Sequence, residues 1–355
     1  EWNAMRLKRA GLLAASGLCL GFVLSWGGLG WAQSSPAGSS GYHLVKSIPV
    51  GGDGLWDYCI VDAGARRLYV SHTDRVVVLN ADTDAIVGEI PDTTGVHGIA
   101  LAADLGRGFT SDGQANSITI FNLKSLGTIA TVASGGKNPD SIFYDAATKR
   151  VITFNGKSGS ATAINARDGK VLGTFDVGGK PEFAAGAGDG RVFVNIEDKS
   201  QILQIDMRKL AILNRWSIAP CEEPSGLAMD KKNRRLFSVC HNNVMAVVDA
   251  DNGKVVATPA IGDGPDAAGF DPATRLAFSS NGGSGTITVV HEDSPDQYRV
   301  IENVPTQKYA RTMAVDYRTH NIFLPTGVFE GAIPPGAKRP PMKPGSFGVL
   351  LVSKK

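Results

Sequence analysis

The sequence predicts an all-β fold, a seven-bladed β-propeller with four antiparallel strands in each blade, and three observations carry this prediction. A short signal recurs every 40 to 46 residues: arginine, then an apolar residue, then an aromatic or apolar one. Each interval holds four short runs rich in Val, Ile, Thr and Phe, too short for ordinary helices. Four strands in a repeat of about 42 residues are typical of propeller blades.

Seven copies of the signal set the number of blades. The copies begin at Arg67, Arg107, Arg150, Arg191, Arg235, Arg275 and, more weakly, Asn321. In the third copy, DSIFYD, RVITFN, ATAIN and VLGTFDV are the four expected strands, and ARDGK is a hairpin turn.

The two ends of the repeat region predict how the ring closes. Residues 42–52, YHLVKSIPVGG, precede the first copy as a lone strand, and residues 346–355, SFGVLLVSKK, end the last copy one strand short. We expect the N-terminal strand to complete the last blade, which removes an exposed sheet edge. Residues 42–355 then form a single propeller domain, preceded by a flexible leader at 33–41.

Residues 5–32 have the pattern of a signal peptide. Positive residues between 6 and 9 precede an apolar run, and small residues flank Trp31 at its end, as signal peptidase requires. A transmembrane anchor is the alternative, although the run is rich in Gly and Ser. Residues 1–4 are expected to be upstream read-through. We expect a periplasmic or secreted protein with no membrane span once this segment is removed.

The charge balance bears on partners. The chain has 36 Lys and Arg against 34 Asp and Glu, and the two counts become equal when residues 1–32 are left out. A near-neutral surface gives no electrostatic reason to expect nucleic acid or an anionic membrane. We expect the partner to be a small molecule or an envelope or extracellular protein, and the protein to be a monomer.

Alignment of the repeats points to one candidate site. Counting back nine or ten residues from each signal reaches the start of the innermost strand in each blade, so seven residues should surround one mouth of the central channel, here called the top face. They are Asp57, His97, Asp140, Glu182, Ser225, Asp266 and Arg311. With His97 neutral, their formal charge of −3 requires compensation by a cation, a cationic ligand, ordered water or carboxylate protonation.

The ring residues have two competing interpretations. As a metal site, Asp57, Asp140, Glu182 and Asp266 would offer oxygen ligands to Ca²⁺ or Mg²⁺. Adding His97 would admit Zn²⁺ or Mn²⁺ and make His97 a candidate general acid or base. As a structural device, each acid would instead accept a backbone N–H from the neighbouring blade.

A second set of residues lies in the loops between the second and third strands on the same face. We expect these residues to form an outer wall of the funnel: His72, Asp112, Asn155, Glu197, Asp198, His241, Asn242 and Asn281. Trp56 is expected either to offer a stacking surface in the mouth or to wedge between blades. The expected ligand-binding residues are therefore Trp56, Asp57, His97, Asp140, Glu182, Glu197, Ser225, His241, Asp266 and Arg311.

Two further features are local. Cys221 and Cys240 lie at the open end of the fifth hairpin, and we expect a disulfide, with a Cys/Cys/His241 metal site or two free thiols as alternatives. A Pro-rich insertion at 329–347 interrupts the last blade on the top face. The insertion could be a lid over the funnel, a partner-docking arm or a disordered surface loop.

The repeats resemble a known family. The segments Arg67-Leu-Tyr-Val-Ser and VVDADNGKVVATPAIGDGPD are similar to the YVTN-type repeat of YncE-like propellers, although Ser71 and His72 stand where that pattern has Thr and Asn. The resemblance implies an exported bacterial seven-bladed propeller, often without an assigned reaction. No nucleophile–base pair, P-loop, GxSxG or HExxH motif is present. We expect a binding protein that uses the acidic mouth; the alternative is a metal-assisted lactonase- or lyase-like enzyme at the same site.

Overall fold

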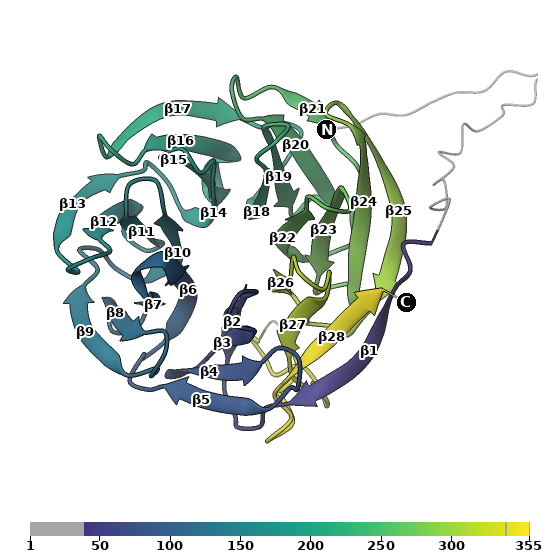
Figure 1. The fold of residues 1–355 in the computed structure, drawn as a ribbon. Coiled ribbons are helices and arrows are strands. Elements are labelled where there is room, and N and C mark those ends of the chain that lie inside the picture. Colours follow the sequence, from purple (N-terminus) through teal and green to yellow (C-terminus); the bar gives the residue numbers. More distant parts are fainter. Residues whose placement is uncertain (1–38, 338, 355) are drawn as a thin grey trace, which may run out of the picture. The chain divides into compact units, whose positions relative to one another are not determined.

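Seven four-stranded antiparallel sheets stand around a central channel in the computed structural model, which describes residues 39–337 and 339–354 (Figure 1). These residues include no α-helix, only two short 3-10 turns at Ala103–Leu105 and Glu197–Lys199. The prediction of an all-β seven-bladed propeller is confirmed. The predicted signal peptide at 5–32 and the read-through at 1–4 lie outside the described residues.

The first six blades follow the chain in order, each from its innermost to its outermost strand. Blade one is β2 (Trp56–Asp62), β3 (Arg67–His72), β4 (Arg75–Asn80) and β5 (Ile86–Ile90). Blade two is β6 (Val96–Ala102), β7 (Arg107–Asp112), β8 (Ser117–Asn122) and β9 (Thr128–Ala133). Blade three is β10 (Pro139–Asp145), β11 (Arg150–Asn155), β12 (Ser160–Asn165) and β13 (Val171–Asp176).

The next three blades repeat this arrangement. Blade four is β14 (Pro181–Gly186), β15 (Arg191–Ile196), β16 (Gln201–Asp206) and β17 (Ala211–Ser217). Blade five is β18 (Pro224–Asp230), β19 (Arg235–Cys240), β20 (Val244–Asp249) and β21 (Val255–Ala257). Blade six is β22 (Pro265–Asp271), β23 (Leu276–Asn281), β24 (Thr286–Ser294) and β25 (Gln297–Pro305).

Blade seven joins the two ends of the propeller. It consists of β26 (Ala314–Val315), β27 (Ile322–Thr326), β28 (Gly348–Lys354) and, outermost, β1 (Tyr42–Pro49). β1 pairs with β28 along its length, from Tyr42 opposite Lys354 to Pro49 opposite Gly348. The expected closure by the N-terminal strand is confirmed, and it leaves the edge of β28 covered.

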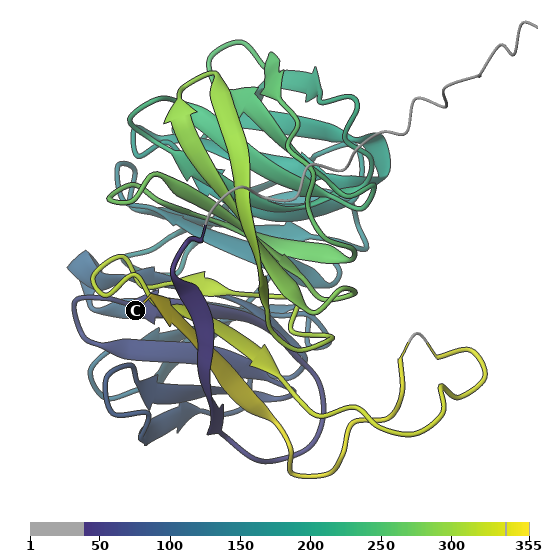
Figure 2. The same ribbon diagram turned by 90° about the vertical axis from the view of Figure 1, so that its right-hand side faces the viewer.

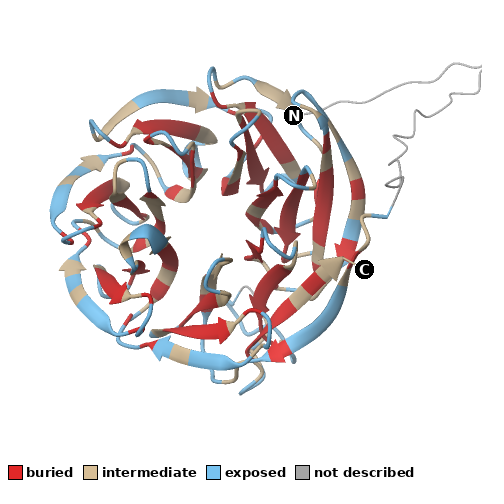
Figure 3. Ribbon diagram, viewed as in Figure 1, coloured by how far each residue is buried: buried red, intermediate tan, exposed pale blue. Residues whose placement is uncertain are grey.

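The aromatic residue of the repeated signal forms the core between blades. Tyr69, Phe109, Phe193, Phe237 and Phe323 occupy the same place in the second strands and are fully buried. Burial is concentrated in the inner strands, whereas the outermost strands alternate between exposed and half-buried residues (Figure 3). Each blade therefore packs its faces against its two neighbours.

The arginine of the signal ties neighbouring blades on the face opposite the mouth. In three copies its guanidinium donates a hydrogen bond to a backbone carbonyl in the next blade, in the turn after the third strand. The pairs are Arg67 with Leu123, Arg150 with Met207, and Arg235 with Pro295. Among the described residues, no helix has the length and apolar character needed to span a bilayer.

Candidate functional site

The ring residues occupy equivalent places in successive blades. Six are the second residue of an innermost strand, and the seventh, Arg311, comes shortly before β26: Asp57 (β2), His97 (β6), Asp140 (β10), Glu182 (β14), Ser225 (β18) and Asp266 (β22). All except His97 line one cavity of about 940 Å³. The Nδ1 atom of His97 lies 2.7 Å from Oδ2 of Asp57, so the seven residues form one group.

Neighbouring blades hold the backbone of these residues in place. The hydroxyl of Ser111 donates to the carbonyl oxygen of Asp140, and Nδ2 of Asn195 donates to that of Ser225 over 2.8 Å. Ser280 and Thr312 do the same for Arg311 and Asp57. Among the described residues, no ring acid accepts a neighbour's backbone N–H; the bonds between blades at this level come from side chains that donate to backbone carbonyls. The ring side chains are left to face the channel.

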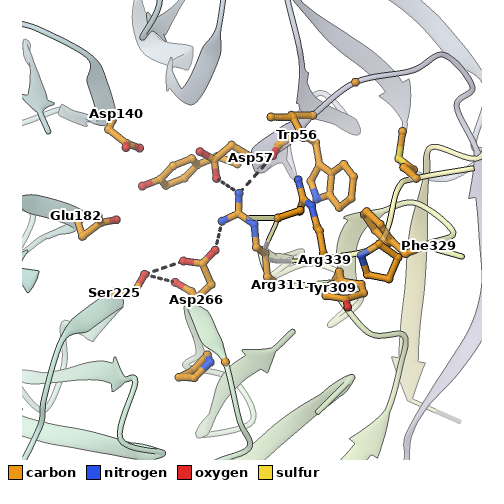
Figure 4. A pocket seen from close by; sticks show the side chains of 18 of the residues that line it. Trp56, Asp57, Asp140, Glu182, Ser225, Asp266, Tyr309, Arg311, Phe329 and Arg339 are labelled. Carbon is orange, nitrogen blue, oxygen red and sulfur yellow. Dashed lines mark hydrogen bonds and ion pairs between the residues drawn. The ribbon is translucent and has the colours of Figure 1, made fainter. Parts of the chain in front are cut away.

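Arg311 connects three blades at the mouth (Figure 4). Its Nη2 donates to Oδ1 of Asp57 over 3.1 Å, and its Nη1 contacts Oδ2 of Asp266. Ser225 completes this network, since its hydroxyl donates to Oδ1 of Asp266 over 2.7 Å. Two of the four ring acids are therefore already paired with groups of the protein itself.

His97 supplies a second internal cation. Burial disfavours its charged form, but the hydrogen bond to Asp57 and the charge of Asp140 outweigh burial and raise the pKa of His97 to about 9. Burial also opposes ionisation of Asp57, yet Arg311 and His97 hold the pKa of that carboxyl below its usual value. At neutral pH, His97 is an imidazolium and Asp57 a carboxylate.

The environment of the remaining two acids, Asp140 and Glu182, disfavours their ionised forms. Burial, followed by the charge of Asp57, raises the pKa of Asp140 to about 6. Burial and the charge of Asp140 raise that of Glu182 to about 9, even though Nζ of Lys180 lies 2.8 Å from Oε1 of Glu182. With His97 charged and Glu182 protonated, the ring carries −1 at neutral pH instead of the formal −3. The expected compensation thus comes mostly from the ring itself.

Asp140 is the ring acid without a donor. Its carboxylate accepts no hydrogen bond from any residue in 39–337 or 339–354, and its nearest cation, Nδ1 of His97, is 3.9 Å away. Two potential donors elsewhere in the cavity lining also have no partner within these ranges, namely the hydroxyl of Tyr58 and Nε1 of Trp56. Both side chains line the cavity. Unpaired polar groups around one cavity are what a polar ligand or ordered water would satisfy.

The structure gathers a different set of possible metal ligands from the one expected. Asp57, His97 and Asp140 each place a ligand atom within 4.8 Å of the others, whereas Glu182 and Asp266 lie outside this group. Both oxygens of Asp57 already accept hydrogen bonds, and His97 holds its proton at neutral pH. The donor set therefore does not fit a resident divalent cation while His97 is protonated.

The expected outer wall is largely wrong. His72, Asp112, Asn155 and Asn281 are fully buried within their blades. Asp112 and Asn281, for instance, bond to threonines of the third strand of their own blade. Asp198 accepts from the backbone N–H of Lys180, and Asn242 donates to the carbonyl of Pro220. Of this set, only Glu197 and His241 line the cavity.

Trp56 packs against the end of the insertion and lies in the cavity lining; a stacking contact with a ligand stays a prediction. Its indole packs against Phe347 at 5.5 Å between ring centroids and also lines the cavity. The insertion contributes Phe329, Arg339 and several prolines to the same lining. Figure 2 shows the yellow insertion standing out from one face of the ring. Its described residues therefore form one wall above the mouth.

Cys221 and Cys240 form a disulfide, with a Cα–Cα distance of 5.5 Å. The metal alternative at these two cysteines and His241 is excluded by this bond. Cys59 is buried in β2 as a free thiol.

Sequence reasoning missed several residues that line the cavity: Asp53, Tyr58, Lys180, Phe183 and Tyr309. Phe329 and Arg339 belong to the insertion at 329–347, for which a lid over the funnel was one of the predictions. Tyr58 and Phe183 directly follow ring positions, and strand alternation alone would have turned them away from the channel. A register shift in the innermost strands, between Trp56 and Cys59 in β2, changes that alternation. Bulges of this kind have no reliable signal in a single sequence.

The fold and this cavity define a seven-bladed β-propeller scaffold, an architecture suited to binding and interaction. No protein-family model matches the chain, and no curated protein sequence matches it.

Several solved structures are similar to it in fold. The structure of U3-55K matches with a TM-score of 0.74 and 9% identity, over 87% of this chain and 98% of that one. The RRP9 WD40 repeats match with a TM-score of 0.75 and 10% identity, over 90% and 99%. Hydrazine synthase of Kuenenia stuttgartiensis matches with a TM-score of 0.66 and 12% identity, over 83% of this chain and 96% of that one. At these identities, the similarity shows the fold alone.

Proposed function

We propose that the protein is an exported binding propeller that takes a ligand with an ammonium group into the mouth of its channel. One observation carries this proposal: the carboxylate of Asp140 lines the cavity but accepts no hydrogen bond from the described residues. Its pKa, raised to about 6, reflects a charge that burial and Asp57 disfavour. An ammonium group would supply both the missing donor and the opposite charge.

The rest of the cavity supports the same ligand class. Its lining includes six carboxyl groups against three lysine or arginine side chains. Aromatic side chains form part of the wall, and such faces favour organic cations. They are Trp56, Tyr58, Phe183, Tyr309 and Phe329. The unpaired donors of Tyr58 and Trp56 would suit an acceptor atom on the same ligand.

A thermal-shift screen with matched compounds tests this proposal. Primary diamines and amino alcohols are each paired with the diol of the same skeleton, for example putrescine with 1,4-butanediol. We expect the amine of a pair to raise the melting temperature and the diol to leave it unchanged. If no amine stabilises the protein more than its diol, the proposed ligand class is wrong.

Export and membership of the YncE-like family belong to the same proposal. The pattern at 5–32 supports export, and so does the Cys221–Cys240 disulfide, because disulfides persist in oxidising compartments. The YVTN-like repeats support the family. Expression of the full chain in a Gram-negative host, with mass analysis of the periplasmic fraction, tests export. We expect a protein that begins at Gln33; an unprocessed cytoplasmic chain would contradict this.

Metal-assisted lactonase- or lyase-like activity is the second candidate. The clustering of Asp57, His97 and Asp140 favours it, although binding would require His97 to release its proton. Elemental analysis after mild purification at pH 8.5, followed by melting with and without a chelator, tests it. Stoichiometric Ca, Mg, Mn or Zn with a chelator-induced loss of stability would support it; metal-free protein with unchanged melting would reject it.

A further inference from the structure

We infer that Trp56 and Phe329 form a guanidinium-binding subsite at the rim of the cavity, and that Arg339 of the insertion occupies this subsite in the free protein. The inference rests on the proposed binding of cationic ligands at the mouth and names one chemical group that the mouth recognises.

The geometry is that of a guanidinium held by two aromatic faces (Figure 4). The Cζ atom of Arg339 lies 5.2 Å from the ring centroid of Phe329 and 5.5 Å from that of Trp56. The two rings are 5.7 Å apart and tilted by 48°, and Tyr309 meets Phe329 edge-on at 4.6 Å. Both cation–ring distances fall within the roughly 6 Å over which a ring attracts a cation.

Among the described residues, only the rings of Trp56 and Phe329 hold the guanidinium of Arg339 in this place. Within residues 39–337 and 339–354, its guanidinium takes part in no hydrogen bond and no ion pair. Burial and the nearby charge of Arg311 both lower the pKa of Arg339, so the positive charge of Arg311 repels it. Its five N–H donors are thus unused, and a guanidinium that brings its own acceptors could replace it.

The unpaired indole of Trp56 is an independent sign of an incomplete site. Trp56 is 4% exposed, lines the cavity, and its Nε1 has no partner among the described residues. Arg339 cannot satisfy that N–H, because a guanidinium has donors only. A ligand that carries an acceptor beside its guanidinium, such as the carbonyl of an arginine residue, could satisfy both groups.

The insertion is anchored at its base and not at its tip. Phe329 pairs with Met342, the N–H of Lys343 donates to the carbonyl of Val328, and that of Gly345 donates to Oδ1 of Asp53. In the described part of residues 331–341, no hydrogen bond reaches the blades. Arg339 can therefore leave the subsite while the base of the insertion stays in place.

Calorimetric titration of the full chain with N-acetyl-L-arginine amide and with agmatine tests the inference. In Arg339→Gln the internal competitor is lost, so we expect both compounds to bind roughly 3- to 30-fold more tightly than to the wild type. Lys343→Gln removes a positive charge from the same insertion and is expected to leave affinity unchanged. Unequal affinities would tell whether a peptide-like arginine or a free guanidino compound is preferred.

Two variants of Phe329 test the ring directly. In the Arg339→Gln background, Phe329→Leu should weaken guanidinium binding at least 5-fold, whereas Phe329→Tyr, which keeps the ring, should retain it. Arg339→Gln that binds neither compound, or binds no more tightly than the wild type, would overturn the inference. If putrescine still stabilises the protein in that case, and Asp140→Asn removes this stabilisation, the proposed function is supported and only the guanidinium subsite is wrong.

Discussion

The Nη2 atom of Arg311 donates a hydrogen bond to Oδ1 of Asp57 over 3.1 Å, although 254 positions separate the two residues in the chain. The contact joins blade seven to blade one, and Nη1 of the same guanidinium reaches Asp266 in blade six. One side chain in the mouth therefore links the closing blade to both of its neighbours and balances two of the ring acids.

Replacing Arg311 by Met should destabilise the propeller by about 2–4 kcal/mol, because Asp57 would keep only His97 as a partner and Asp266 only the Ser225 hydroxyl. The side chains of Asp57 and Asp266 are only 15% and 17% exposed, so water would compensate little. Chemical denaturation measures the change. The matched control is Arg299→Met, whose pair with Asp293 is exposed and should contribute under about 1 kcal/mol. Equal losses in the two variants would contradict the role given to Arg311.

Alkaline pH should destabilise the ligand-free protein. His97 has a folded-state pKa of about 9 against an ordinary 6.5, so the stability it contributes is present below pH 6.5 and is lost as pH rises toward 9. Glu182, also raised to about 9, acts in the same direction. The His97 contribution is at most about 3 kcal/mol. Between pH 6.5 and pH 9 the melting temperature of the wild type should fall, and that of His97→Asn should fall less. An equal fall in both proteins would show that His97 does not cause the loss of stability.

Acid should act through a different histidine. His72 is fully buried against Phe347, and burial, with a smaller contribution from Arg75, lowers its pKa to about 4. Its contribution is therefore lost as pH falls from 6.5 to 4. His72→Leu should reduce the decline in melting temperature over this range, whereas His43→Leu in β1 should not. A decline of the same size in His72→Leu would show that other groups cause it.

Ring closure depends on the start of β1. Tyr42 is 3% exposed, packs edge-on against Phe278 of blade six, and donates its hydroxyl hydrogen to the carbonyl of His320 over 2.9 Å. Tyr42→Ala should lower the free energy of unfolding by about 3–5 kcal/mol. Leu44→Ala in the same strand should have little effect, because Leu44 is 40% exposed. Similar values for both would mean that β1 adds little to closure.

The sequence was sufficient for the architecture because each blade repeats the same requirements. In five of the seven copies an aromatic residue such as Phe237 fills the space between blades, and in three copies an arginine such as Arg235 bonds to the next blade, so both recur at a fixed interval. The lone strand predicted at 42–52 and the incomplete last repeat together predicted the closure. Alignment of the seven repeats also predicted which residues begin the innermost strands.

The arrangement of side chains at the mouth was harder to predict from the sequence. The alignment placed Asp57 and His97 at equivalent positions, but their hydrogen bond depends on the distance across two blades. His72 and Asp112 end their strands on a side that faces into the blade, which a loop interpretation could not reveal. The path of the insertion, which brings Arg339 over Trp56, depends on contacts specific to one blade. No repeat encodes it.

Calorimetric titration of putrescine into the wild type and into Asp140→Asn at pH 7.5 tests the central claim, that the unpaired carboxylate of Asp140 receives a ligand's ammonium group. Asp168→Asn, in the β12–β13 turn on the opposite face of the same blade, is the control. We expect at least 10-fold weaker binding to Asp140→Asn and unchanged binding to Asp168→Asn. Equal affinity of the wild type and Asp140→Asn would contradict the claim.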